Sequence, residues 1–126
     1  MAAKIAIVED DQPIREMYEL KLSSVGYNVK SAGNGVEGLK LLEEFNPDLV
    51  LLDLMMPEMN GEEVLKKYRH LPGGKDTKVI ILTNISRDEA SKDLSKLDVT
   101  DYIIKANHTP TQVIEIVQNI LAPHSK

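Results

Sequence analysis

Cysteine is absent from the chain of 126 residues. Its absence excludes a disulfide framework, a thiolate zinc site and a cysteine nucleophile, and it favours a reducing compartment. Long hydrophobic runs are absent as well, since no window approaches the roughly 20 apolar residues that a membrane-spanning helix needs. The first residues run directly into a strand-like segment, with no signal-peptide pattern. These absences predict a cytoplasmic protein without membrane insertion.

Basic residues are in the minority. The chain has 15 lysines and arginines against 20 acidic residues, which gives a net charge of −5. No basic cluster is visible, so we expect no direct contact with nucleic acid. The length fits one domain over residues 1–126, which would bury roughly two thirds of the surface of the unfolded chain. We expect a stand-alone domain without an output domain.

Short apolar runs alternate along the chain with longer segments of helical periodicity. Residues 5–8, 49–52 and 79–82 are continuously apolar and rich in β-branched side chains, as strands buried on both faces of a parallel sheet are. Residues 27–32 alternate in polarity and residues 102–104 form a short run, so we interpret both as edge strands. Helical patterns lie between Asp11 and Gly26, between Val36 and Asn46, between Gly61 and Pro72, over Ala90–Leu97 and after Thr109.

Five strand–helix units in this order predict a doubly wound α/β fold, with helices on both faces of a five-stranded parallel sheet. Because the second and fifth strands have edge character, we predict the strand order 2-1-3-4-5, the flavodoxin-like arrangement. Ligands of such sheets bind beyond the carboxyl ends of the strands. The residues that follow each strand are therefore the candidates for a functional site.

Polar residues follow four strands that this order makes neighbours. Glu9 and Asp10 follow the first strand, Asp53 the third, Thr83 the fourth and Lys105 the fifth. Carboxylates gathered in this way repel one another and suit a hard divalent cation such as Mg²⁺. An aspartate with such a cation, a lysine and a hydroxyl group nearby can receive a phosphoryl group. Taken singly, each residue also fits a helix cap, a turn or a solvated side chain, so the prediction rests on their joint placement.

The residues around these positions resemble the receiver domain of two-component response regulators. Residues 5–11 are similar to that family's first strand and acidic pocket. Residues 53–61 are similar to the segment around its phosphorylated aspartate, including Met-Pro and a glycine eight residues after the aspartate. Thr83, Lys105 and Tyr102 match the family's hydroxyl, lysine and aromatic switch positions. The resemblance covers essentially the whole chain.

The resemblance implies that Asp53 accepts a phosphoryl group from the phosphohistidine of a sensor histidine kinase or of a phosphotransfer protein. It implies that Asp10, Asp53 and the backbone carbonyl of Met55 bind Mg²⁺, with Glu9 assisting through a water molecule. Lys105 would pair with the phosphoryl oxygens. The chain would be a signalling phosphoprotein that promotes its own phosphotransfer and dephosphorylation, and not a turnover enzyme.

The resemblance also implies a conformational switch. Thr83 would move toward the phosphate and leave space for Tyr102 to turn inward. The change would alter the surface formed by the helix over Ala90–Leu97, the strand at residues 102–104 and the last helix, which follows Thr109. We expect a downstream protein to bind this surface, on a monomer or on a homodimer that depends on phosphorylation.

Three positions depart from the commonest pattern of the family. Ala106 follows Lys105 where many members have proline, which argues against a cis peptide bond there and leaves the geometry of the loop open. Asn84 follows Thr83 where a smaller residue is usual, and it would narrow access to the pocket. Gly38 occupies a position where alanine is common.

Parts of the sequence also fit four other functions. Gly33, Gly35 and Gly38 spell the GxGxxG pattern of dinucleotide-binding proteins, with Asp53 20 residues after the first glycine. The pattern follows an edge strand, however, and gives the polar strand-end residues no role. An FMN-binding flavodoxin would place phosphate where the acidic run after the first strand repels it. A phosphatase would need a second carboxylate beside Asp53. A constitutive binding module that acts unphosphorylated remains an alternative.

Overall fold

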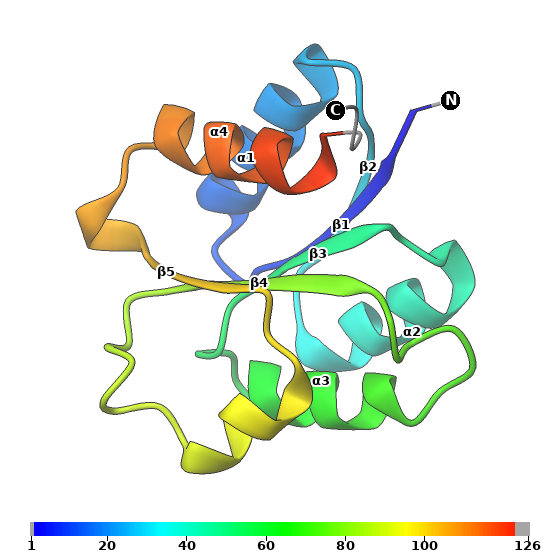
Figure 1. The fold of residues 1–126 in the computed structure, drawn as a ribbon, viewed down its shortest axis with the longest axis vertical. Helices are drawn as coiled ribbons and strands as arrows, with labels where there is room; N and C mark the ends of the chain where they lie inside the picture. Colours follow the sequence, from blue (N-terminus) through cyan, green and yellow to red (C-terminus); the bar gives the residue numbers. More distant parts are fainter. Residues whose placement is uncertain (1, 123–126) are drawn as a thin grey trace.

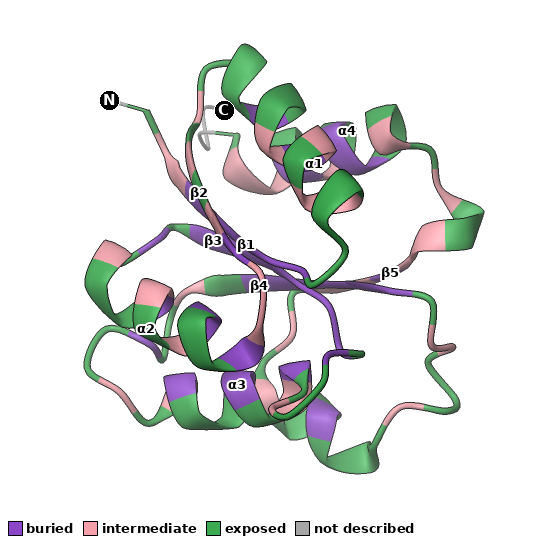
Figure 2. Ribbon diagram, turned by 180° about the vertical axis from the view of Figure 1, so that it is seen from behind, coloured by how far each residue is buried: buried purple, intermediate pink, exposed green. Residues whose placement is uncertain are grey.

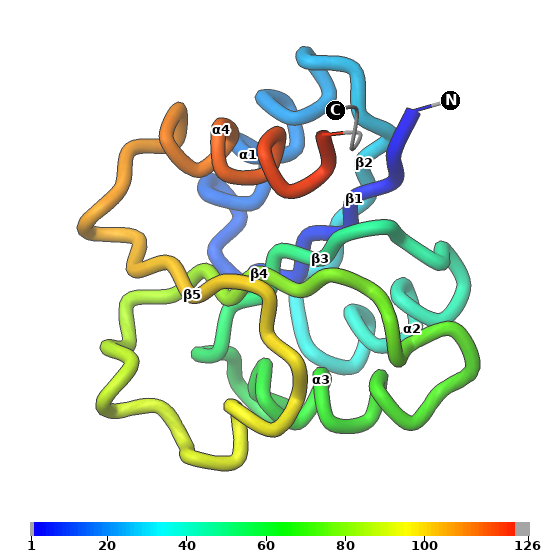
Figure 3. The backbone as a smooth tube through the Cα atoms, viewed as in Figure 1, coloured from blue at the N-terminus to red at the C-terminus, as the bar shows by residue number. Residues whose placement is uncertain are grey.

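The computed structural model describes residues 2–122 and contains a five-stranded parallel sheet. The strands lie in the order β2-β1-β3-β4-β5, so the predicted fold class and strand order are confirmed (Figures 1 and 3). The three inner strands are buried almost throughout, whereas burial alternates along β2 as its sequence predicts. The strands are β1 Lys4–Val8, β2 Asn28–Ala32, β3 Leu49–Leu52, β4 Lys78–Thr83 and β5 Asp101–Ile104.

Helices cover both faces of the sheet (Figure 1). One face carries α1 (Gln12–Ser24) and α4 (Pro110–Leu121), and the other carries α2 (Gly35–Phe45) and α3 (Gly61–Arg69). Two short 3-10 segments, η1 (Lys92–Leu97) and η2 (Lys105–Asn107), lie on either side of β5 in the sequence. Over residues 2–122, none of the helices has the length and apolar character required to cross a membrane.

Side chains at the helix ends explain where the helices begin and stop. Asp11 Oδ1 accepts a hydrogen bond from the N–H of Ile14 at 3.1 Å, so Asp11 caps α1 at the start of the predicted helical pattern. Helix α4 begins in the same way after Thr109, whose hydroxyl oxygen accepts from the N–H of Gln112 at 3.2 Å. Gly26 follows α1 with a φ of +104°, a left-handed conformation that glycine adopts without strain.

Two apolar layers, one on each face of the sheet, form the core. Successive residues of a strand point to opposite faces, so each inner strand contributes to both layers. Figure 2 shows the buried residues concentrated in the central strands and on the inner sides of the helices. The layer under α1 and α4 includes Ile5, Ile7, Leu22, Leu51 and Val117, and the layer under α2 and α3 includes Ala6, Val8, Leu42, Leu52 and Leu65. A sheet covered on both faces leaves its strand ends as the place for polar groups.

The prediction of a regular helix over Ala90–Leu97 is wrong, because this part of the chain forms the six-residue 3-10 segment η1 instead. Inside the segment, the Ser95 hydroxyl donates a hydrogen bond to the carbonyl of Lys92 at 2.8 Å. Serine side chains that bond to the nearby backbone compete with helix formation. Only Leu94 of η1 is buried, so packing adds little that would favour a regular helix.

Candidate functional site

The carboxyl ends of four neighbouring strands bring the predicted residues to one edge of the sheet. Glu9 and Asp10 follow β1, Asp53 follows β3, Thr83 ends β4 and Lys105 follows β5. Val8 pairs with Leu52, so Glu9 and Asp53 follow level positions, and Thr83 pairs with Ile104, the residue before Lys105. The site is therefore a direct consequence of the strand order.

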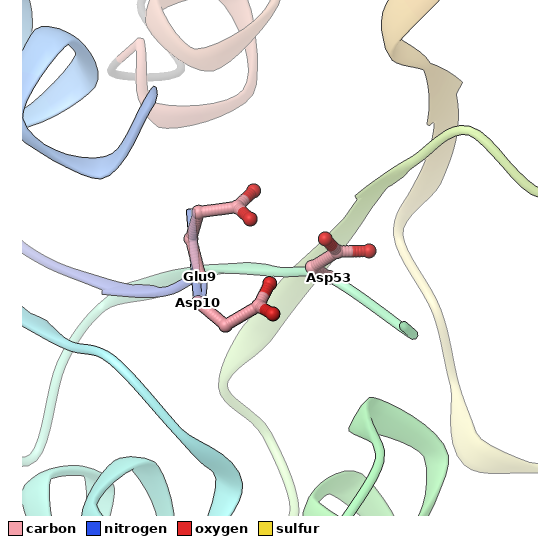
Figure 4. A group of neighbouring side chains, drawn as sticks. All are labelled: Glu9, Asp10 and Asp53. Carbon is pink, nitrogen blue, oxygen red and sulfur yellow. The ribbon is translucent and has the colours of Figure 1, made fainter. Parts of the chain in front are cut away.

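Three carboxylates form the centre of the site. Glu9, Asp10 and Asp53 each offer one oxygen atom, and these oxygens lie within 4.8 Å of one another. Figure 4 shows Glu9 and Asp10 extending from the end of β1 toward Asp53 at the end of β3. Glu9 and Asp53 are only 4% and 5% exposed, whereas Asp10 is exposed. Asp10 thus forms the solvent-facing side of the carboxylate cluster.

Lys105 supplies a positive charge to the cluster. Its Nζ donates to Glu9 Oε1 at 2.6 Å and to Asp53 Oδ2 at 3.1 Å. All three side chains are largely shielded from solvent, which strengthens such charge-assisted hydrogen bonds. One ammonium group cannot balance three carboxylates, so the site favours the arrival of a further cation.

Burial and neighbouring charges shift the pKa values of two groups in the site. Burial raises the pKa of Glu9, the charge of Asp53 raises it further, and together they outweigh the hydrogen bond from Lys105, so that the pKa is about 7. Burial lowers the pKa of Lys105, but its bonds and charge interactions with the two carboxylates raise it by more, to above its ordinary value. The pKa of Glu9 is thus raised mainly by its burial and in addition by its repulsion from the neighbouring carboxylate.

Backbone N–H groups orient the two buried carboxylates. The N–H of Asp11 donates to Glu9 Oε2, and the N–H of Met55 donates to Asp53 Oδ1, both at 3.1 Å. Lys105 bonds to the second oxygen of each carboxylate. Both side chains are thus held at both oxygens. The expected binding of a metal by the Met55 carbonyl stays a prediction.

The two residues predicted as a switch are connected through the loop after β4. Thr83 is completely buried, and its hydroxyl oxygen accepts a long hydrogen bond of 3.5 Å from the N–H of Ile85. Tyr102 is partly buried on β5, and its hydroxyl donates to the carbonyl of Ile85 at 2.6 Å. The guanidinium group of Arg87 lies over the Tyr102 ring, 5.3 Å from its centre. A movement of this loop would reach both residues.

Packing requires Gly35 and Gly38 of the GxGxxG pattern, whereas Gly33 faces the flexible end of the Arg15 side chain. A Cβ atom on Gly38 would lie 2.5 Å from Cγ1 of Val8, and one on Gly35 would collide with a backbone carbonyl of the loop before α3. A Cβ atom on Gly33 would lie 2.8 Å from the guanidinium group of Arg15. The pattern therefore reflects the close approach of α2 to its neighbours, and it does not need a dinucleotide to explain it.

Two polar residues beside the site, Arg15 and Asn84, make contacts that were not among the predictions. Arg15 Nη1 donates to the backbone carbonyl of Glu9 at 3.0 Å. Asn84 Oδ1 accepts from the N–H of Ala106 at 3.1 Å. The position of Arg15, one turn after the start of α1, could have suggested its contact, since helical side chains lean toward the N-terminus. Asn84 has its partner in another loop, and no local signal predicts that.

The geometry supports two kinds of chemistry. Several carboxylate oxygens, one of them on an exposed residue, are the ligands that Mg²⁺ prefers in proteins. A carboxylate such as that of Asp53 can also act as a nucleophile. Lys105, already hydrogen-bonded to Asp53, is placed to neutralise an anionic group that arrives there.

Comparison with known proteins relates this geometry to a family. The response regulator MprA of Mycobacterium sp. strain KMS is 39% identical over 107 residues, which are 83% of this chain and 45% of that protein. MprA of Mycobacterium tuberculosis strain CDC 1551 / Oshkosh is 37% identical over 107 residues, with the same 83% and 45% covered. The chain thus spans less than half the length of these curated relatives.

Solved structures of similar proteins have the same fold. The chemotaxis protein CheY4 of Vibrio cholerae superposes with a TM-score of 0.87 at 28% identity, over 96% of this chain and 100% of that one. A CheY-like response regulator receiver domain protein of Methanospirillum hungatei JF-1 gives a TM-score of 0.81 at 30% identity, over 96% and 94%. The family model of the response regulator receiver domain matches residues 5–118. The chain therefore belongs to the response regulator receiver domains of two-component signalling.

Proposed function

We propose that this receiver domain is a signalling switch triggered by phosphorylation of Asp53. The observation that carries the proposal is the position of the Lys105 ammonium group, which is hydrogen-bonded to Asp53 within a cluster of three carboxylates. Response regulators interact with histidine kinases or phosphotransfer proteins, and one of these would supply the phosphoryl group as a phosphohistidine.

The transfer is a displacement at phosphorus. An oxygen of the Asp53 carboxylate attacks the phosphorus atom of the phosphohistidine and forms an O–P bond, which makes an acyl phosphate. The P–N bond breaks, its electron pair stays on the imidazole ring of the donor, and that ring takes up a proton. Lys105 neutralises charge on the phosphoryl oxygens, and the hydroxyl of Thr83 donates to one of them.

The carboxylate cluster fits Mg²⁺, because its oxygens converge and because burial, together with the charge of Asp53, raises the pKa of a Glu9 carboxyl that no cation neutralises fully. Asp10, Asp53 and the Met55 carbonyl would hold the ion, with Glu9 assisting through a water molecule. The chemistry that the bound ion supplies is neutralisation of the negative charge that gathers around Asp53. The domain promotes its own phosphotransfer and dephosphorylation and is not a turnover enzyme.

The output of the switch is a changed surface around η1, β5 and α4. Thr83 and Tyr102 both bond to Ile85, which supports a coupled movement when Thr83 turns toward a phosphate. A downstream protein would recognise the altered surface on a monomer or on a phosphorylation-dependent homodimer. Direct binding of nucleic acid by this domain is not part of the proposal, since the chain is acidic.

Phosphorylation by a small donor tests the proposal. Wild-type protein is incubated with acetyl phosphate with and without Mg²⁺, and the acyl phosphate is located by mass spectrometry. We expect labelling that depends on Mg²⁺ and is lost in Asp53→Asn. The matched control is Asp76→Asn, because Asp76 is exposed and precedes β4 at the other edge of the sheet. Equal labelling of wild type and Asp53→Asn, or an unlabelled wild type, would contradict the proposal.

A further inference from the structure

One side-chain hydrogen bond joins the two loops that follow β4 and β5. Asn84 Oδ1 accepts from the backbone N–H of Ala106 at 3.1 Å. Asn84 directly follows Thr83, and Ala106 directly follows Lys105. The bond therefore continues the connection between the two strands beyond Thr83 and Ile104, which are the last residues that pair.

The turn that carries Lys105 has few other restraints. Ala106 and Asn107 of segment η2 are exposed, and the contact between His108 Nδ1 and the carbonyl of Ile104, which spans the turn, is long at 3.3 Å. The closing hydrogen bond of the turn, from the N–H of His108 to the carbonyl of Lys105, is long at 3.4 Å. The first N–H groups of such a turn need acceptors from outside it. Asn84 supplies one of them from the neighbouring strand, in the way that asparagine caps a helix.

The position of this turn decides where the ammonium group of Lys105 lies. Lysine has a long flexible stem, so its backbone must be held if Nζ is to keep a fixed place. Nζ contacts Glu9 Oε1 at 2.6 Å and Asp53 Oδ2 at 3.1 Å. The longer contact is near the end of the usual range, and a shift of about 1 Å would break it. A restraint on Ala106 is thus a restraint on the contact between Lys105 and Asp53.

We infer that Asn84 is a positioning residue, which holds the Lys105 ammonium group against Asp53 through its hydrogen bond to Ala106. The inference deepens the proposed function, because it assigns the geometry of the phosphorylation site to a residue that does not touch Asp53 through any hydrogen bond in the described structure. It also connects Asn84 with Ala106, two of the positions at which this chain departs from the commonest family pattern. A proline at position 106 would have no N–H to donate, whereas Ala106 has one and Asn84 accepts it.

Chemical labelling of the metal-free protein tests the inference without any phosphorylation. Trace amounts of acetic anhydride acylate free amines, and mass spectrometry gives the rate at Lys105. We expect this rate to rise about fivefold in both Asn84→Leu and Asn84→Ala, since loss of one net hydrogen bond frees the turn to that extent. Asn84→Asp keeps an acceptor oxygen of the same shape and should retain the protection of the wild type. Lys96, whose side chain is 78% exposed, is the internal control.

The set of variants separates positioning from steric access. If Asn84 only narrowed the entrance to the pocket, Asn84→Ala would raise the rate at Lys105 and the equally large Asn84→Leu would not. That pattern would overturn the inference, as would unchanged rates in both variants or an equal rise in Asn84→Asp. Should Asn84→Leu fail to fold, Asn84→Val takes its place, because valine also fills the position and has no acceptor oxygen, and the same criterion applies.

A second readout connects the contact to phosphorylation. If wild-type protein is labelled at Asp53 by acetyl phosphate, the initial rate should fall about fivefold in Asn84→Leu and Asn84→Ala and recover in Asn84→Asp. The acylation experiment does not depend on this reaction, so a failure of the proposed function and a failure of the inference give different results. A normal phosphorylation rate in Asn84→Leu would overturn the inference.

Discussion

Neighbouring groups have opposing effects on the protonation of the Glu9 carboxyl group. Its burial and the nearby charge of Asp53 favour the protonated form, whereas the hydrogen bond from Lys105 favours the ionised form. The balance places its pKa at about 7, well above the usual value for glutamate. A carboxyl group that titrates near neutrality would make the proposed binding of a cation in this site sensitive to pH.

We predict that the affinity for Mg²⁺ rises with pH and levels off above about pH 7. Below the pKa of Glu9, a cation that interacts with its carboxylate must displace a proton, which weakens binding by up to about tenfold per pH unit. Calorimetric titration with Mg²⁺ between about pH 5 and pH 9 measures this. The control is Glu9→Gln, which cannot titrate and should give a nearly flat profile. A flat profile for the wild type would contradict the prediction.

Gly38 of α2 lies close to the side chain of Val8, which leaves little space for a larger residue. An alanine there normally favours a helix by about 1 kcal/mol, but its Cβ would lie 2.5 Å from Cγ1 of Val8. We expect Gly38→Ala to lower the free energy of unfolding by about 1–3 kcal/mol in the wild type. In a Val8→Ala background the contact is gone, and the same change should be neutral or stabilising. Urea denaturation of the four proteins measures both effects, and equal losses in the two backgrounds would contradict the explanation.

The helices and strands differ in how well local sequence predicts them. Asp11 and Thr109 were recognisable as caps because a capping side chain acts within its own first turn. The inner strands were recognisable because both of their faces are buried, which requires continuous apolar residues. The segment over Ala90–Leu97 has helical spacing, yet too little of it is buried to overcome the bond of the Ser95 hydroxyl to the backbone. Periodicity predicts a helix correctly only where packing supports it.

Arg69 of α3 forms hydrogen bonds that hold the end of η1 in place. Its guanidinium group donates to five backbone carbonyls, three in the loop before β4 and two at the end of η1, namely those of Gly74, Lys75, Thr77, Leu97 and Asp98. The five N–H groups of arginine point in fixed directions, which a lysine ammonium group cannot reproduce. Arg69 is therefore the connection between α3 and the start of the proposed output surface.

We predict that Arg69→Lys lowers the free energy of unfolding by about 1–3 kcal/mol and accelerates amide hydrogen exchange in η1 before other elements. The matched control is Arg87→Lys, because Arg87 is exposed and its guanidinium group contacts the Tyr102 ring. Chemical denaturation and hydrogen exchange followed by mass spectrometry give the two quantities. Unchanged exchange over residues 92–98 in Arg69→Lys would show that these bonds do not hold η1.

At the scale of the whole molecule, the site could be predicted because the strand order could be predicted. Glu9, Asp53 and Lys105 are far apart in the chain, and the strand order alone indicates that they meet. The contact of Asn84 with Ala106 could not be predicted in this way, because it depends on the conformation of two loops. Loop geometry arises from many weak contacts between distant segments, whereas strand order follows from a few strong patterns.

The concentration of negative charge at one edge of an acidic molecule should limit the stability of the metal-free protein. We predict that Asp53→Asn raises the free energy of unfolding by about 1 kcal/mol without Mg²⁺, since it removes one crowded carboxylate and keeps an oxygen that accepts from Lys105.

With Mg²⁺ at about 100 times its Kd, the free energy of unfolding of the wild type should rise by about 2.7 kcal/mol, and that of Asp53→Asn by far less. Urea denaturation with and without Mg²⁺ measures this, and Asp76→Asn should behave as the wild type does. An equal gain in both proteins would mean that the cation binds elsewhere. A less stable Asp53→Asn would mean that the bonds of Asp53 outweigh its repulsion by Glu9 and Asp10.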